Sequence, residues 1–229
     1  MKIGSLQPKR PSSPPPKFPF MKINHKRAWF ENPDGERIGS TLDAVILGQL
    51  RSRIMWPGQF GSGERPVCKS DDSVTGTPLE NFPWNESKFA EVESNKLGIP
   101  CEECSFKEWD KDFGRARCQE TWTIALLVVQ NGNVSDTPWL LNFTSSGITT
   151  LRDYFRPMIE QKTHPFNYVT RIKLHAVAKG DSKWSKPEFA RLGDTSYEQH
   201  NFYVGLLRQV KKELRPAPLS KGIVPIKLG

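Results

Sequence analysis

The alternation of apolar and polar residues through the central part of the chain is mostly that of β-strands. The strongest signal is a continuous apolar run at residues 121–130, and a second strand is expected at residues 139–144. Residues 26–30 and 36–38 flank an Asn-Pro-Asp-Gly sequence at residues 32–35. Because Pro and Gly supply the backbone angles of a tight turn, these two segments predict a hairpin.

Two further segments have the apolar spacing of helices. The first begins near Ser145 and places four apolar residues on one face, and we expect Pro157 to end or kink it. The second covers residues 195–214, with Asp194 or Thr195 as its expected cap. Residues 42–56 fit a helix or a bent strand equally well. Together these patterns predict a mainly β protein with short helices, of the α+β class.

Residues 167–191 are expected to form a long hairpin with one apolar and one basic face. In an extended strand Ile172 and Leu174 point to one side, whereas Lys173 and His175 point to the other. Basic residues interleaved with aromatic rings suit single-stranded nucleic acid, because cations follow the phosphates and rings stack on bases. The candidate nucleic-acid-binding residues are Arg171, Lys173, His175, Lys179, Lys183, Trp184, Lys186, Phe189 and Arg191.

The charge distribution favours a polyanionic partner. The net charge is +8, but residues 64–112 contain 12 acids and 6 bases, so the rest of the chain carries +14. A basic body attracts nucleic acid, since each neutralised phosphate releases condensed counterions. In the alternative interpretation the charge only keeps the protein soluble, and Trp184 and Phe189 belong to the core.

The four cysteines have a spacing typical of a zinc site, C-x32-C-x2-C-x13-C. Cys101 and Cys104 are separated by two residues, so both thiolates can reach one tetrahedral ion, and Cys68 and Cys118 supply the remaining two ligands. We expect one structural zinc per chain, because four thiolates leave no open position for water. Three alternatives stay open: two disulfides in a secreted protein, a redox pair, or unrelated buried thiols.

Proline and basic residues mark both ends of the chain. Residues 1–22 contain six prolines and no acid, and we expect a disordered basic arm there. Residues 215–229 are expected to be a C-terminal tail. Residues 23–214 then form one domain, with a zinc-binding insertion at about 66–120. No apolar run has the length of a membrane span and no signal peptide is evident, so we expect a soluble intracellular protein without a membrane partner.

The order of these elements resembles that of bacteriophage single-stranded DNA-binding proteins. It runs through a strand, an inserted CxxC segment, two strands, a short helix and a long hairpin with a Lys- and Trp-rich turn. The strings at residues 66–76, 101–106 and 117–120 also resemble phage-encoded proteins in which a cysteine before an Asp-rich turn, a CxxC and a final cysteine recur. The resemblance implies an OB-fold-like five-stranded barrel with an inserted zinc-binding segment. The chain departs from the pattern in lacking a histidine ligand and an acidic C-terminal tail.

These observations predict a sequence-nonspecific single-stranded DNA-binding protein that protects or organises single strands in replication or recombination. Its expected partners are single-stranded DNA or RNA and other replication or recombination proteins, in the cytoplasm of a bacterial host if the chain is phage-encoded. We expect no enzymatic activity, because the four histidines are scattered and no nucleophile, P-loop or dinucleotide motif is present. The alternative is a zinc-containing regulator that binds a host or phage protein such as RNA polymerase.

Overall fold

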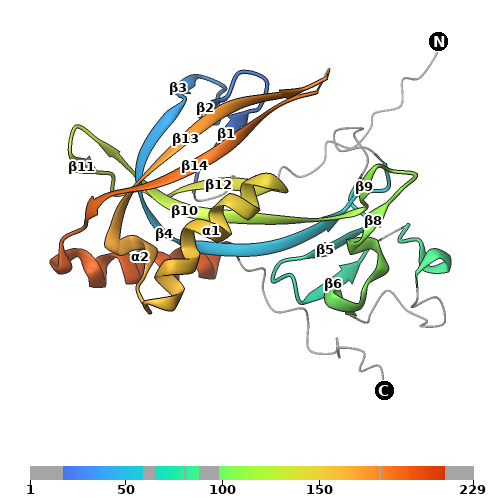
Figure 1. Cartoon of the computed structure of the whole chain (residues 1–229). Helices are drawn as coiled ribbons and strands as arrows, with labels where there is room; N and C mark the ends of the chain where they lie inside the picture. The colour runs from blue at the N-terminus through green and yellow to red at the C-terminus, as the bar shows by residue number, and fades with distance from the viewer. Residues whose placement is uncertain (1–17, 59–64, 80, 88–97, 181, 215–229) are drawn as a thin grey trace, which may run out of the picture.

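The computed structural model describes residues 18–58, 65–79, 81–87, 98–180 and 182–214. Within them the protein is mainly β with two α-helices, which confirms the predicted class (Figure 1). The strands are β1 (Phe20–Asn24), β2 (Trp29–Glu31), β3 (Arg37–Gly39), β4 (Thr41–Met55), β5 (Cys68–Ser70), β6 (Thr75–Pro78), β7 (Ile99–Pro100), β8 (Trp109–Asp110), β9 (Arg115–Ala116), β10 (Cys118–Gln130), β11 (Asn133–Val134), β12 (Trp139–Thr144), β13 (Tyr168–Lys179) and β14 (Ser182–Asp194). The helices are α1 (Ser146–Glu160) and α2 (His200–Leu214), with short 3-10 turns η1 (Trp84–Glu86), η2 (Cys101–Glu103), η3 (Ser105–Lys107), η4 (Pro165–Asn167) and η5 (Tyr197–Gln199).

Twelve of the described strands belong to one mixed sheet. Its main path is β3-β2-β1-β12-β10-β4-β5-β6-β7, with β11 paired to β10 and the β13–β14 hairpin paired to the first half of β4. The pairing of β1 with β12 is parallel, and the other pairings are antiparallel. Strands β8 and β9 form a separate two-stranded sheet.

Strands β4 and β10 are buried on both faces where they cross the middle of the molecule. On β10, Ile124 and Leu126 enter one hydrophobic core, whereas Ala125 and Leu127 enter a second core on the opposite face. A strand covered on both faces has a continuous apolar sequence without alternation. This explains why residues 42–56 fitted helix and strand equally well, and the structure shows that they form β4.

The two helices cover opposite faces of this sheet. Helix α1 contributes Leu151 and Phe155 to the first core, and α2 contributes Tyr203 and Val210 to the second. Helix α2 approaches β4 closely at Gly48, where a Cβ atom would lie 2.8 Å from a methyl carbon of Leu207. A larger residue at this position would require the Leu207 side chain to shift.

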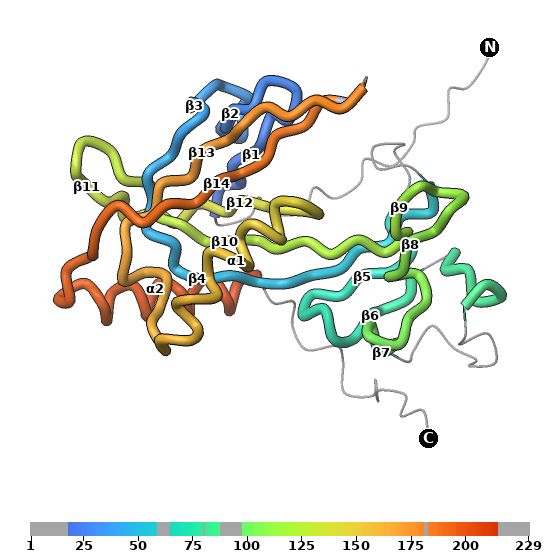
Figure 2. The backbone as a smooth tube through the Cα atoms, viewed as in Figure 1, coloured from blue at the N-terminus to red at the C-terminus, as the bar shows by residue number. Residues whose placement is uncertain are grey.

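One end of the molecule is a separate small unit that contains all four cysteines. Strands β4 and β10 run past the two helices as long bowed strands and carry this unit at their far end (Figures 1 and 2). We call residues 65–79, 81–87 and 98–118 the cysteine module and the remaining described residues the body. The module has a third core of its own, in which Phe82 packs edge-on against Phe106 at a ring-centroid distance of 5.7 Å.

The predicted five-stranded barrel is not formed, because the sheet stays open. Strand β14 pairs only with β13 in the described residues, while β12 pairs with β10 on one side and with β1 on the other. The strand β1 thus occupies the edge of β12 that would otherwise be available for closure. Side chains bridge the opening instead, since the rings of Phe143 on β12 and Phe189 on β14 meet edge-on at 5.6 Å.

Three boundaries also differ from the sequence predictions. Residues 18–22 belong to the folded body, since Phe18 is buried in the second core and β1 starts at Phe20; residues 1–17 and 215–229 lie outside the described part. Helix α1 continues through Pro157 to Glu160 without ending there. The cap of the C-terminal helical segment is Ser196, whose hydroxyl accepts a hydrogen bond from the Glu198 amide. In the described residues no helix has the length and apolarity needed to cross a membrane.

Candidate metal centre and nucleic-acid interface

The four predicted zinc ligands lie together at the base of the cysteine module. Cys68 and Cys118 are the first residues of β5 and β10, Cys101 is the first residue of the 3-10 turn η2, and Cys104 directly follows this turn. The amide of Cys104 donates to the carbonyl of Cys101 at 3.3 Å, and this turn brings the two CxxC residues onto one side. All four cysteines line one cavity of about 10 Å³, which is close to the space that a single water molecule or ion needs.

None of the four cysteines forms a disulfide in the structure. Met55 of β4 pairs with Cys118 on one side and with Cys68 on the other, so these two cysteines lie two strands apart. Two strand spacings separate their Cα atoms by about 10 Å, which is too far for a disulfide between them. This register argues against the interpretation that includes a Cys68–Cys118 disulfide.

The thiols lie in a poorly solvated environment that disfavours an isolated thiolate. Burial, followed by the neighbouring Cys104 and Cys101, raises the pKa of Cys118 to about 12, although Arg53 acts in the opposite direction. Burial is also the main cause that raises the pKa of Cys68 and of Cys101. Deprotonation of this group of sulfurs therefore needs a cation that compensates the charge.

The cysteine group fits a zinc ion in its donor chemistry, but the predicted site is not confirmed. In the described part of the chain no group of three or more His, Cys, Asp or Glu side chains is arranged so that it could hold a metal ion as it stands. Two observations fit a zinc ion: the shared small cavity and a close backbone approach at Gly76. A Cβ atom on Gly76 would lie 3.1 Å from Sγ of Cys68 and 3.6 Å from Sγ of Cys101, so the glycine keeps space beside the sulfurs.

The β13–β14 hairpin presents most of the predicted nucleic-acid-binding residues on one face. The pairing register puts His175 opposite Lys186, Lys173 opposite Glu188, and Val177 opposite Trp184. Residues paired in this way point to the same side of a sheet, so these six form one outer face. The opposite face carries Ile172 and Leu174, which are buried in the first core. The predicted division into an apolar and a polar face is confirmed.

Several of the predicted cations on the hairpin already have partners. The guanidinium group of Arg171 donates two hydrogen bonds of 2.8 Å to Asp43 on β4. Arg191 is hydrogen-bonded to Asp194 and lies 3.9 Å from the ring centroid of Tyr168. His175 contacts Glu188 at 2.5 Å.

Four lysines of the hairpin are exposed and have no ion-pair partner among the described residues. They are Lys173, Lys179, Lys183 and Lys186. The structure therefore separates the predicted cations into paired and unpaired groups. The unpaired lysines are the ones whose charge is available to a phosphate.

Phe189 does not belong to the outer face of the hairpin. Its ring stacks on Tyr154 of α1 at 5.5 Å and packs edge-on against Phe143, so it is part of the first core. For this residue the core interpretation is correct and the stacking prediction is wrong. Trp184 is different: it is partly buried and lines a hollow of about 440 Å³ beside β14.

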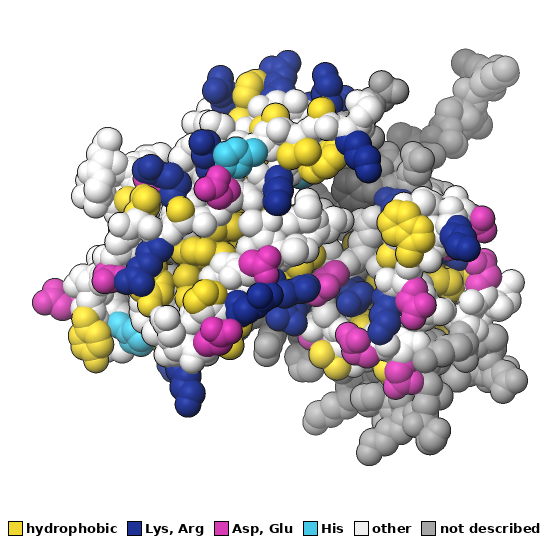
Figure 3. Space-filling view, viewed as in Figure 1, with side chains coloured by type: hydrophobic (Ala, Val, Ile, Leu, Met, Phe, Trp, Pro, Cys, Tyr) yellow, Lys and Arg dark blue, Asp and Glu magenta, His cyan; other side chains and the backbone are white. Residues whose placement is uncertain are grey.

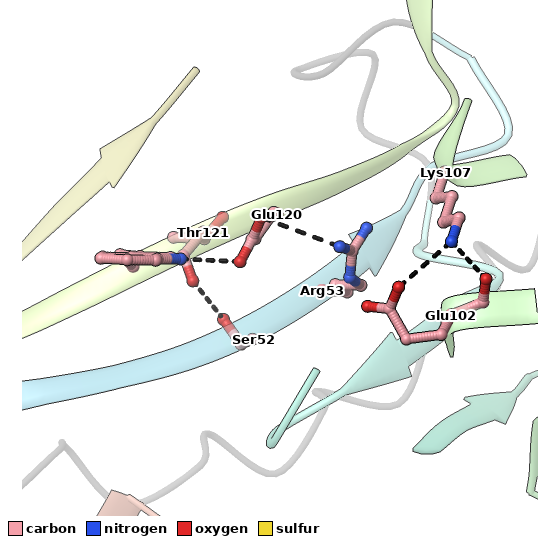
Figure 4. A network of polar contacts seen from close by, with 7 residues as sticks. Ser52, Arg53, Glu102, Lys107, Glu120 and Thr121 are labelled. Atoms are coloured by element: carbon pink, nitrogen blue, oxygen red, sulfur yellow. Dashed lines mark hydrogen bonds and ion pairs between the residues drawn. The ribbon is translucent and has the colours of Figure 1, made fainter. Parts of the chain in front are cut away.

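A cluster of arginines around Trp122 was missed at the level of the sequence. Arg51 and Arg152 lie 4.4 Å and 5.5 Å from the Trp122 ring centroid. The indole Nε1 donates to Glu120 at 2.7 Å, and Glu120 faces Arg53 at 3.7 Å (Figure 4). These residues come from β4, β10 and α1, so no local pattern could reveal that they meet. Three guanidinium groups and one carboxylate thus lie around this tryptophan in the described residues, and the cluster is positively charged.

One acidic residue of the module, Asp72, supports the chain around it. Asp72 accepts hydrogen bonds from Ser70 and from the amides of Val74 and Thr75. Burial alone would raise the pKa of Asp72, but these hydrogen bonds outweigh it and the pKa is lowered. Asp72 therefore stabilises the turn that leads into β6.

The space-filling view shows how charge is distributed over one face of the molecule (Figure 3). Lys and Arg side chains gather over the upper part of the view, where the β13–β14 hairpin lies, whereas most of the Asp and Glu side chains over the cysteine module lie among basic ones. Comparison with known proteins gives no match to any family model, to any curated protein or to any solved structure. The residues and the fold are therefore the basis for a functional assignment.

Proposed function

We propose that the protein binds single-stranded nucleic acid without sequence specificity, and that its cysteine module carries a structural zinc. The observation that carries the proposal is the outer face of the β13–β14 hairpin, which presents the partly buried Trp184 together with three lysines that have no ion-pair partner among the described residues, Lys173, Lys179 and Lys186. Flexible lysines can follow a phosphate backbone of any sequence, and an indole ring can stack on any base.

The connectivity of the body supports this assignment. The antiparallel strands β4, β10 and β12 are followed by α1 and then by the β13–β14 hairpin, and β13 returns to pair with β4. This order agrees with that of an OB fold, a five-stranded, partly open Greek-key barrel, although in this chain the strands belong to a larger open sheet. In this correspondence the tip of the hairpin is the loop between strands 4 and 5, and the cysteine module is inserted between strands 1 and 2. These two loops and the face of strands 2 and 3 are where OB folds bind oligonucleotides.

A base-specific reading of duplex DNA has little support in the same residues. Duplex readers insert a helix or ribbon with polar side chains into the major groove. Helix α1 packs its apolar face on the first core, and α2 packs on the second. The hairpin carries lysines, which bind as mobile point charges, and its arginines are already held by carboxylates. Preference for flexible single strands follows from this composition.

The test compares labelled oligo-dT with duplex DNA of the same length by fluorescence anisotropy. We expect tighter binding to oligo-dT, and a loss of about 1–3 kcal/mol of binding free energy in Trp184→Ala. Lys173→Gln should lower the salt slope by about one unit, because one phosphate contact is lost.

Arg171→Gln is the matched control, since Arg171 lies on the same face two residues away but is held by Asp43. It should change the salt slope less than Lys173→Gln does. Tighter binding to duplex, or capture of one dominant protein with no binding to oligo-dT, would instead favour a different class, such as a zinc-containing regulator of another protein. If Trp184→Ala unfolds the protein and the lysine variants bind as tightly as the wild type, the hairpin is an ordinary solvated surface and not the binding site.

A further inference from the structure

A groove of about 350 Å³ separates the cysteine module from the first turns of α1. Its charged and aromatic lining comes from four parts of the chain that are distant in the sequence. The residues that matter are Arg53, Lys107, Trp109, Arg115, Glu120 and Arg152. Four cations thus face one carboxylate in the described lining of the groove.

The one carboxylate in this lining is already engaged. Glu120 accepts a hydrogen bond from the Trp122 indole and faces Arg53, as Figure 4 shows for the pair with Arg53. Lys107 is paired with Glu102 at 3.2 Å. Arg115 donates to the carbonyl of Gly58 at 2.9 Å, a contact that leaves its charge in place. Arg152 lies against the Trp122 ring, and this contact does not neutralise it either. Arg115 and Arg152 therefore remain available to an anion.

Trp109 supplies a stacking surface at the same groove. It is the first residue of β8 and is 71% exposed, although the module has a core that holds Phe82 and Phe106. A tryptophan left so far outside a nearby core leaves a large apolar surface in water, which favours contact with a ligand ring. In this hairpin Trp109 pairs with Ala116 and Asp110 pairs with Arg115, and both Trp109 and Arg115 line the groove.

The groove lies next to the hollow beside the β13–β14 hairpin. Ser145 lines both cavities, and the hollow continues past Ser146 and Gly147 to Trp184. The first turn of α1 between them carries no acidic residue that would repel a phosphate. In the described linings of the two hollows the one acidic residue is Glu120.

We propose that this groove is the second contact region for the same single strand of nucleic acid, an inference that rests on the proposed function. Arg115 and Arg152 bind its phosphates, and Trp109 stacks on one of its bases. The strand runs from the β13–β14 hairpin over the first turn of α1 to the cysteine module. The module, whose sequence is acidic overall, in this way contributes a basic and aromatic surface to binding.

The experiment measures the affinity of the full chain for fluorescent oligo-dT of about 5 and about 16 nucleotides, which span the site sizes of OB folds. The wild-type protein should bind the longer probe more tightly, because a second region is engaged. Trp109→Ala should weaken binding of the longer probe by about five-fold or more. Arg152→Gln should lower the salt slope by about one unit. Trp184→Ala should weaken both probes.

Two matched controls separate the groove from exposed residues elsewhere. Tyr197→Ala removes an aromatic ring that is 90% exposed and does not line the groove, and Arg156→Gln removes an arginine on α1 that pairs with Asp153. Both should bind the longer probe as the wild type does. As a readout that needs no variant, oligo-dT containing 5-iododeoxyuridine should form a photo-crosslink to Trp109.

The outcomes distinguish this inference from the function on which it rests. Wild-type affinity and salt slope in Trp109→Ala and Arg152→Gln, with no crosslink to Trp109 and weaker binding in Trp184→Ala, would overturn the groove and leave the hairpin as the binding surface. Absence of binding of the wild-type protein to either probe would overturn the proposed function and the groove with it.

Discussion

The body and the cysteine module are built on the same two strands, but different forces hold them together. The two cores of the body contain eighteen and nine buried residues in the described chain, whereas the core of the module contains seven, two of which are cysteines. Small cores rarely provide enough stabilisation without a cross-link or a metal. The comparison shows that the cysteines lie in the part of the molecule where buried apolar side chains are too few to stabilise the fold by themselves.

The position of the cysteines within the module is consistent with a cross-linking role. Cys68 and Cys118 begin the two strands that flank the end of β4, and Cys101 and Cys104 lie on a 3-10 turn outside the long strands. An ion held by all four would join the end of the long ladder to the irregular part of the module. A body with its own large cores needs no such link.

The largest expected effect is the loss of the metal from the module. We expect elemental analysis to find about one zinc per chain. Cys101→Ser should cause a large loss of folding stability in the module, because structural zinc contributes on the order of 10 kcal/mol to the folding of small modules. Hydrogen exchange should become fast in residues 98–118, while the amides of β10 from Trp122 to Leu126 stay protected.

Glu103→Gln is the matched control for this prediction, because Glu103 lies between the two CxxC cysteines and is not a thiol. It should retain zinc and protection. The proposal of a structural zinc fails if protein purified without chelator contains no metal, or if its mass is four hydrogens lower, as two disulfides would make it.

A smaller effect is expected from substitutions in the cores. Leu126 is fully buried in the first core of the body, and Leu126→Ala should lower the free energy of unfolding of the whole body by about 2–5 kcal/mol. Phe106 is 7% exposed in the core of the module, and Phe106→Ala should increase exchange in the module alone. Denaturant unfolding followed by Trp fluorescence, together with hydrogen exchange, measures both. A loss of stability of the whole chain in Phe106→Ala would show that body and module unfold as one unit, and would contradict the view that they are stabilised separately.

Much of the body could be predicted from the sequence because its signals are local. The continuous apolar run that became β10, the alternation of β13 and the helical spacing of α1 each reflect which side of one element is buried. The ends of elements were less predictable. Pro157 lies in the last turn of α1, where only one helical hydrogen bond is lost, so the helix continues past it.

The candidate sites were predictable only in part, because they depend on contacts between distant segments. The spacing of the cysteines was sufficient to predict that the four thiols would lie close together, and all four line one cavity. The alternation of the hairpin identified its polar face, but nothing local in the sequence showed that Asp43 would hold Arg171 across 128 positions. The arginine cluster around Trp122 is a further case, since it is assembled from β4, β10 and α1. The net negative charge of residues 64–112 also gave no indication that the module lines a basic groove.

The smallest effect concerns the ion pair between Arg171 and Asp43, which joins the β13–β14 hairpin to β4 in the body. The hydrogen bond from Arg171 is the main cause that lowers the pKa of Asp43 below its ordinary value. A carboxyl group with a lowered pKa in the folded protein stabilises it above its unfolded pKa of about 3.9, and this contribution is lost as the pH falls through the folded value. Asp43→Asn should therefore reduce stability slightly and equally between pH 5 and pH 8, and thermal unfolding at several pH values measures this. The same substitution releases Arg171 on the outer face of the hairpin, so it should tighten binding to oligo-dT and raise the salt slope by up to about one unit. Weaker binding in Asp43→Asn would mean that the pair positions the hairpin, and that its orientation matters more for the nucleic acid than one additional free charge.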